Sequence, residues 1–261
     1  MELFRTDNGA SVKDTDVLAA FRQVGIKQGD LLFVHSSLKA FGMLAQPDTQ
    51  ALMAALVTAF TEIIGEKGTL IMPTFTDNFL KGKPYHTDDR STVGALTEFY
   101  RGQPGVSRTL HPFFSVATRG PRSAELADIS HDSFDAHSIF GNVHRLDGLL
   151  VFFGARFQSC TFVHYVEQIH GVPYRFMKTF EGVIVDGERS YRDSYTYFVR
   201  PLDGNVDPEF SRLGKRLLDS GMMREAPLGH GRVFAVRARD LFDEGSKLLD
   251  ADIYSLLKQK P

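Results

Sequence analysis

Three short apolar runs, at residues 31–35, 69–73 and 149–153, constrain the fold of this chain more than any other feature. Each run has the length of a strand, and none alternates apolar with polar residues. This is typical of strands that are buried on both faces of a sheet. A loop and a helical pattern follow each run, at 48–64, 92–101 and 161–170. The alternation predicts an α/β fold with a central, largely parallel sheet flanked by helices.

The sequence pattern changes after residue 180. Shorter strands are predicted at 182–187, 191–198 and 231–236, and a closing helix at 238–257. We expect these elements to form an antiparallel C-terminal extension. No internal repeat, proline-rich linker or low-complexity tract is present. We therefore interpret residues 1–261 as a single domain, with a soft subdivision near 175–180 into a cofactor-binding and catalytic core and a mixed extension.

Charge and cysteine content exclude several classes of protein. Lys and Arg number 30 against 32 Asp and Glu, and no block of like charge occurs, which argues against a nucleic-acid binder. Cys160 is the only cysteine, so an intrachain disulfide and a cysteine-rich zinc site are ruled out. Neither a signal-peptide pattern nor an apolar stretch of about 18 residues is found. We expect a cytoplasmic protein without a membrane segment.

Common catalytic signatures are missing from the sequence. It has no G-x-x-x-x-G-K-[ST] loop, no G-x-G-x-x-G after a strand, no G-x-S-x-G and no H-E-x-x-H. Nucleotide hydrolysis, Rossmann-type redox chemistry and the usual serine hydrolase and zinc protease mechanisms therefore lose support.

Polar groups follow the three predicted buried strands. They are His35, Ser36 and Ser37 after the first, residues 74–77 after the second and residues 160–167 after the third. In a parallel sheet these ends meet at one edge, where ligands commonly bind. Backbone amides and hydroxyls at the Ser-Ser pair suit a phosphate or pantetheine amides. An ordinary turn or helix cap explains the same pair equally well.

His164 and Glu167 are three residues apart on a predicted helix, so their side chains share a face. A carboxylate beside an imidazole fixes its tautomer and is expected to raise its pKa, an arrangement that suits a general base. A satisfied polar pair on a half-buried helix is the alternative. Glu167 and His170 also form Glu-x-x-His, but no second such pair occurs, so we expect no metal site.

Taken together, the segments resemble the aminoglycoside 3-N-acetyltransferase family, whose fold differs from the common GNAT acetyltransferase fold. The matching stretches occur in family order. They are GDLLFVHSSL at 29–38, GTLIMPTF at 68–75, TVGALTEFYR at 92–101, SR at 107–108 with HP at 111–112 and SV at 115–116, GLLVFFG at 148–154 and TFVHYVE at 161–167. The resemblance covers roughly residues 15–175. The C-terminal third matches only loosely.

The resemblance implies direct transfer of an acetyl group from acetyl-coenzyme A (acetyl-CoA) to an amine of an amino sugar. It implies that His164 is the base, that Glu167 orients it and that Thr161 donates to the thioester oxygen. The same resemblance assigns acetyl-CoA binding to His35, Ser36, Ser37, Leu38, Thr74, Phe75, Ser107 and Arg108, and acceptor binding to Asp77, Glu98 and Tyr165.

The acceptor is left open by the sequence. Family members that take aminoglycosides usually carry a longer, acid-rich insertion after the second strand, whereas residues 77–90 here are short and mix acids with Lys81, Lys83 and Arg90. A nucleotide-linked or surface-glycan amino sugar fits this loop as well as an antibiotic does. A non-catalytic protein that binds CoA or an amine is the alternative from another class. Assembly into a homo-oligomer is compatible with the sequence.

Overall fold

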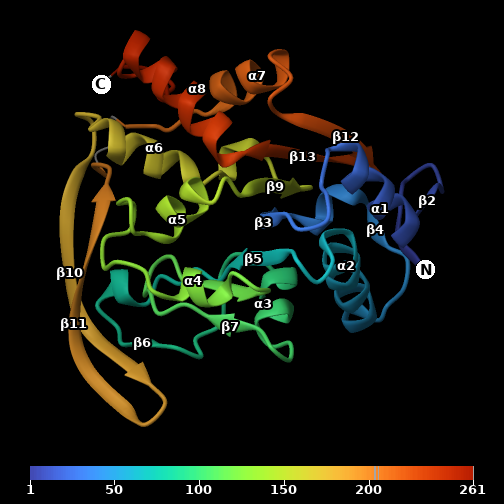
Figure 1. The fold of residues 1–261 in the computed structure, drawn as a ribbon, viewed down its shortest axis with the longest axis horizontal. Helices are drawn as coiled ribbons and strands as arrows, with labels where there is room; N and C mark the ends of the chain where they lie inside the picture. The colour runs from blue at the N-terminus through green and yellow to red at the C-terminus, as the bar shows by residue number, and fades with distance from the viewer. Residues whose placement is uncertain (203, 205, 261) are drawn as a thin grey trace.

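In the part of the chain that the structure describes, the central sheet has seven strands, of which five run in the same direction. We describe it from a computed structural model, which places residues 1–202, 204 and 206–260 (Figure 1). In sheet order the strands are β12 (Arg224–Leu228), β13 (Gly231–Arg237), β9 (Leu149–Phe153), β3 (Leu31–Ser36), β5 (Thr69–Pro73), β8 (Val116–Arg119) and β7 (Ser107–Arg108). Strands β13 and β8 run opposite to the other five.

The three predicted buried strands lie side by side at the centre of this sheet. Strands β9, β3 and β5 are paired in parallel, and every residue from Leu149 to Phe153 and from Thr69 to Pro73 is buried. The predicted parallel core is therefore confirmed. Because the strands are parallel, their carboxyl ends meet at one edge, where Ser36 bridges to Gly154.

Helices cover both faces of the sheet (Figure 1). Residues alternate along β3, so Leu32 and Val34 pack on one face while Leu31 and Phe33 pack on the other. The first face is covered by α1 (Asp14–Gln23), α2 (Thr49–Ile64) and α3 (Ala95–Arg101), and the second by α5 (Ile139–Arg145), α6 (Phe162–His170), α7 (Ser211–Asp219) and α8 (Ala238–Ala251).

The remaining elements are short. They are β1 (Glu2–Arg5), β2 (Ser11–Lys13), β4 (Met43–Leu44), β6 (Tyr85–His86), α4 (Ser123–Ala127) and the 3₁₀ turns η1 (Leu38–Phe41), η2 (Phe79–Lys81) and η3 (Phe157–Ser159). No helix within the described residues is both long enough and apolar enough to cross a membrane.

The C-terminal extension divides between two sheets, which corrects the expectation of one antiparallel unit. Strand β13 pairs with β9 and so completes the central sheet. Strands β10 (Phe176–Asp186) and β11 (Arg189–Val199) form a long hairpin in a separate sheet with β6. The hairpin runs along one side of the molecule (Figure 1). The alternating patterns predicted strands here, but they did not specify which sheet each strand joins.

Two predicted helix boundaries were also wrong. The helix expected from Thr92 begins at Ala95, because Gly94 has φ 137°, which is not a helical conformation. The closing helix ends at Ala251 rather than at residue 257. Helices α5 and α7 and strand β8 were not predicted.

Candidate active site

The predicted contact between His164 and Glu167 is present. Helix α6 places both side chains on one face, and His164 Nδ1 lies 2.6 Å from Glu167 Oε2. Glu167 is fully buried, whereas the His164 side chain keeps 19% of its surface exposed. Nδ1–H donates to the carboxylate, so Nε2 carries the free lone pair. No hydrogen bond within the described residues occupies Nε2.

Two further residues, which the sequence analysis missed, complete a buried charged cluster. The Tyr174 hydroxyl donates to Glu167 Oε1 at 2.9 Å, and Arg175 Nε lies 2.8 Å from Glu167 Oε2. Arg175 Nη2 is also 3.1 Å from His164 Nδ1. Both residues come from the turn that follows α6, where Gly171 adopts a left-handed conformation and redirects the chain. Their position shortly after Glu167 in the sequence is the signal by which these two residues could have been predicted.

The pKa of His164 is lowered, contrary to the expectation that Glu167 raises it. Burial disfavours the imidazolium, and the positive charge of Arg175 adds to this, so the hydrogen bond and charge of Glu167 are outweighed. Burial by itself would raise the pKa of Glu167, but the hydrogen bond from His164 and the nearby positive charges lower it. At neutral pH the cluster therefore contains a neutral imidazole, a carboxylate and a guanidinium.

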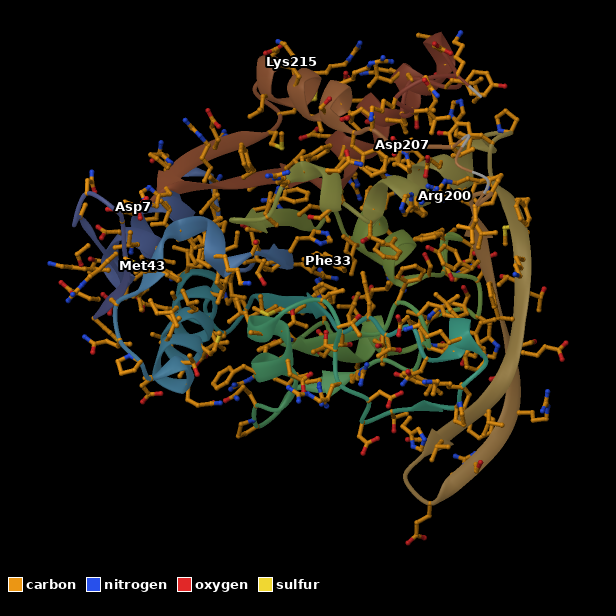
Figure 2. All side chains as sticks on the ribbon, turned by 180° about the vertical axis from the view of Figure 1, so that it is seen from behind. Asp7, Phe33, Met43, Arg200, Asp207 and Lys215 are labelled. Carbon is orange, nitrogen blue, oxygen red and sulfur yellow. The ribbon has the colours of Figure 1, made fainter. Side chains whose placement is uncertain are left out.

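His164 lines a cavity of about 500 Å³. The hairpin β10–β11 supplies five of its twelve described lining residues, and the others come from η2, from α6 and the turn after it, and from the segment that follows β11. The lining residues are Leu80, His164, Arg175, Phe176, Lys178, Phe180, Tyr197, Val199, Arg200, Pro201, Leu202 and Pro208. Figure 2 shows Arg200 beside the end of the hairpin that adjoins the body of the molecule. The C-terminal third, which matches the family pattern only loosely, thus forms one side of the candidate active site.

The first predicted acetyl-CoA segment lies at the end of β3. His35 is buried and its ring stacks on Phe152 at 5.3 Å, so burial lowers the pKa of His35 to about 4. Ser37 is exposed and Ser36 is half-buried, while Leu38 begins η1 and packs against the core. The two serines therefore remain accessible, and His35 is part of the interior.

The second predicted acetyl-CoA segment is divided between a structural network and the surface. Thr74 is buried, and Arg108 donates to its hydroxyl and carbonyl oxygens, to Ser115 and to the carbonyls of Thr87 and Asp89. These contacts give Arg108 a structural role, which competes with the predicted role in phosphate binding. Ser107 is exposed, with its hydroxyl near the carbonyl oxygen of Thr118.

A second cavity, of about 700 Å³, is lined by residues that neighbour the predicted acetyl-CoA residues Ser36 and Phe75, although these two are not among its described lining residues. Its lining includes Thr92 and Gly94. Thr92 donates through its amide and its hydroxyl to the Phe75 carbonyl, and a Cβ built on Gly94 would lie 3.8 Å from Ser36 Oγ. The lining is rich in hydroxyl and amide groups, with Thr49, Gln50, Ser91, Thr92 and Gln103. Such groups suit the amides of a pantetheine chain.

The residues assigned to the acceptor are not gathered around His164. Tyr165 is buried on another face of α6, where its hydroxyl contacts His144 Nδ1 at 2.9 Å. Glu98 is held by Arg101 in a two-pronged ion pair and lines the second cavity. Asp77 pairs with Lys81 at the surface. Thr161, at the start of α6, is half-buried, and its side chain makes no capping hydrogen bond.

Comparison with known proteins agrees with this architecture. The AAC-IIIb structure with bound CoASH superposes with a TM-score of 0.79 at 19% identity, over 95% of this chain and 99% of that one. The structure of AAC-VIa bound to sisomicin superposes with a TM-score of 0.76 at 21% identity, over 92% of this chain and 97% of that one. The predicted fold class is confirmed.

Sequence comparison gives the family. Aminoglycoside N(3)-acetyltransferase IX of Micromonospora chalcea is 24% identical over 277 residues, which cover 94% of this chain and 96% of that protein. Residues 33–250 match the family model described as aminoglycoside 3-N-acetyltransferase, which spans most of the chain. The chain therefore belongs to the aminoglycoside 3-N-acetyltransferase family.

Proposed function

We propose that this protein transfers the acetyl group of acetyl-CoA to an amine of an amino-sugar acceptor, with His164 as the general base. The observation that carries the proposal is the buried His164–Glu167 pair, whose free Nε2 belongs to a side chain that lines a cavity. Family membership supports the reaction, and a relative with bound sisomicin supports an aminoglycoside as an acceptor.

Two cavities match the two substrates of such a reaction. The cavity at His164 is proposed for the acceptor, and the second cavity for the pantetheine end of acetyl-CoA. When bound, acetyl-CoA supplies the acetyl group as a thioester. The hydroxyl and amide side chains of the second cavity would hold its amides. The hydroxyl of Thr161, which makes no capping hydrogen bond, would donate to the thioester oxygen.

The cluster around His164 suits proton removal from an attacking amine. Only a neutral amine attacks a carbonyl, so its proton must leave as the new N–C bond forms. Nε2 accepts this proton because Nδ1–H is held by Glu167. As the N–C bond forms, the C–S bond of the thioester breaks, and the proton held at Nε2 would pass to the departing thiolate to give free CoA thiol. Glu167 stabilises the imidazolium that results, and Tyr174 and Arg175 keep the carboxylate charged and fixed.

The test is release of free CoA thiol during incubation with acetyl-CoA and an amino-sugar panel that includes sisomicin. We expect His164→Ala to lower kcat/KM by about 10²- to 10⁴-fold, with the melting temperature and CoA binding retained. Near wild-type activity in this variant would refute the assigned base. Absence of thiol release with every amine, alongside normal CoA binding, would favour the non-catalytic binding protein.

A further inference from the structure

The cavity at His164 has a positive lining. Three cationic side chains line it, namely Arg175, Lys178 and Arg200, and none of its lining residues within the described part of the chain is acidic. Arg175 is balanced by Glu167. Lys178 and Arg200 take part in none of the ion pairs formed between described residues. Among the described lining residues, the accessible charge is therefore positive.

The two cations are set among apolar walls. Lys178 lies opposite Tyr197 in the hairpin register, and its Nζ is 4.8 Å from the centre of the Phe180 ring. Arg200 directly follows β11 and donates through Nη1 to the Val206 carbonyl at 2.9 Å, which anchors the guanidinium. The Phe176 side chain, also in the lining, is half exposed. Few polar groups on apolar walls are typical of a site that orients one small ligand.

A positive lining selects against a polycation. Like charges brought together in an interface are costly, and this cost grows with each ammonium group of an aminoglycoside. The same field favours the neutral form of a single acceptor amine, which is the reactive form. An anionic group on the acceptor gains charge-assisted hydrogen bonds from lysine and arginine.

We infer that the acceptor is an amino sugar that carries an anionic group, of which phosphate is the model, and that Lys178 and Arg200 bind this group while His164 takes the proton of the amine. The inference rests on the proposed function, because it assigns the cavity at His164 to the acceptor. It narrows the acceptor from amino sugars in general to those with a negative charge.

Three acceptors test this selectivity under one set of conditions. Glucosamine, glucosamine 6-phosphate and sisomicin are compared by thiol release, and their binding to the protein saturated with CoA is measured by calorimetry. We expect glucosamine 6-phosphate to have the highest kcat/KM and the lowest Kd, with an advantage that falls as salt is added. Higher kcat/KM and tighter binding for sisomicin would overturn the inference and leave the acetyltransferase proposal intact.

Variants of the hairpin locate the anion site. In Lys178→Gln the ratio of kcat/KM for glucosamine 6-phosphate to that for glucosamine is expected to fall about tenfold, the effect of one lost charge-assisted hydrogen bond, and Lys178→Arg should restore most of it. Arg192→Gln is the matched control, because Arg192 is exposed on the same hairpin and does not line the cavity. An equal fall in Arg192→Gln would contradict a specific site at Lys178.

Inhibition by inorganic phosphate tests whether Lys178 and Arg200 bind an anionic group of the acceptor or the phosphates of acetyl-CoA. Inhibition that competes with glucosamine 6-phosphate supports the inference. Inhibition that competes only with acetyl-CoA would mean that the cations hold the phosphates of the donor, and it would overturn the inference. Tight calorimetric binding of glucosamine 6-phosphate without any thiol release would refute the proposed reaction while supporting anion recognition at the cavity.

Discussion

At the scale of single residues, the chemistry of the site depends on the burial of the His164 imidazole and on the charges around it. The sequence identified His164 and its carboxylate partner, but the sign of the pKa shift came from burial and from the positive charges of Arg175 and Arg200. Arg175 is eleven residues away and reaches the pair only because the chain turns at Gly171. A local motif gives the identity of a base, whereas its pKa depends on every charge packed around it.

The pH dependence of the reaction tests how the charge of Arg175 affects the pKa of His164. Burial and the positive charges of Arg175 and Arg200 all lower the pKa of His164, and Arg175→Gln removes one of these three causes. The pKa should then rise towards its ordinary value, so the acid limb of kcat/KM should move to higher pH. Profiles between pH 5 and pH 8 measure the shift, with Arg192→Gln as the control. A limb that stays in place would contradict the electrostatic role of Arg175.

At the scale of elements, the hairpin β10–β11 lines the cavity at His164 that we propose for the acceptor. Its strands pair in register over eleven residues from Phe176 to Asp186, and Gly182 lies against the ring of Phe79 in η2. A Cβ at Gly182 would lie 2.6 Å from that ring. This close approach fixes the hairpin against the loop that also contributes Leu80 to the cavity.

Adding a side chain at this contact should displace the hairpin. We expect Gly182→Val to raise KM for the acceptor several-fold, to leave KM for acetyl-CoA within a factor of two, and to lower the free energy of unfolding by about 2 kcal/mol through overpacking. Steady-state kinetics and urea unfolding measure these effects. The control is Glu181→Val, because the Glu181 side chain is exposed. A change confined to KM for acetyl-CoA would refute the assignment of the two cavities.

At the scale of the whole molecule, two buried histidines make the fold sensitive to acid. Burial lowers the pKa of His35 to about 4, and burial with the charge of His131 lowers that of His111 to about 3. Both side chains are uncharged in the folded protein, whereas in the unfolded chain they bind protons near pH 6.5. Below that pH the unfolded state binds more protons, so the free energy of unfolding falls as pH falls.

The size of this effect follows from the shift at His35. Between pH 7 and pH 5 it removes about 2 kcal/mol from the free energy of unfolding, and His111 removes a similar amount. We expect His35→Phe, in which an aromatic ring still packs on Phe152, to lose about 2 kcal/mol less than the wild type over this interval. Urea unfolding at the two pH values measures the difference. Equal losses in both proteins would show that His35 does not carry the effect.

The sequence by itself determined those features that depend only on residues close together in the chain. The runs at β3, β5 and β9 have no polar face, so they had to lie inside a sheet, and the spacing of His164 and Glu167 on α6 brought their side chains together. Family resemblance added the reaction. These properties depend on neighbouring residues in the chain, so they could be predicted from the sequence.

Only the tertiary structure decided which distant groups meet. The patterns at 176–199 and 231–237 look alike as strands, yet one forms the cavity wall and the other completes the central sheet. Likewise, Arg108 became a structural cross-link, Tyr165 entered the core, and Lys178 and Arg200 came to face the cavity of His164. Strand pairing and side-chain burial bring together residues that are far apart in the chain, so these contacts cannot be predicted from local sequence spacing.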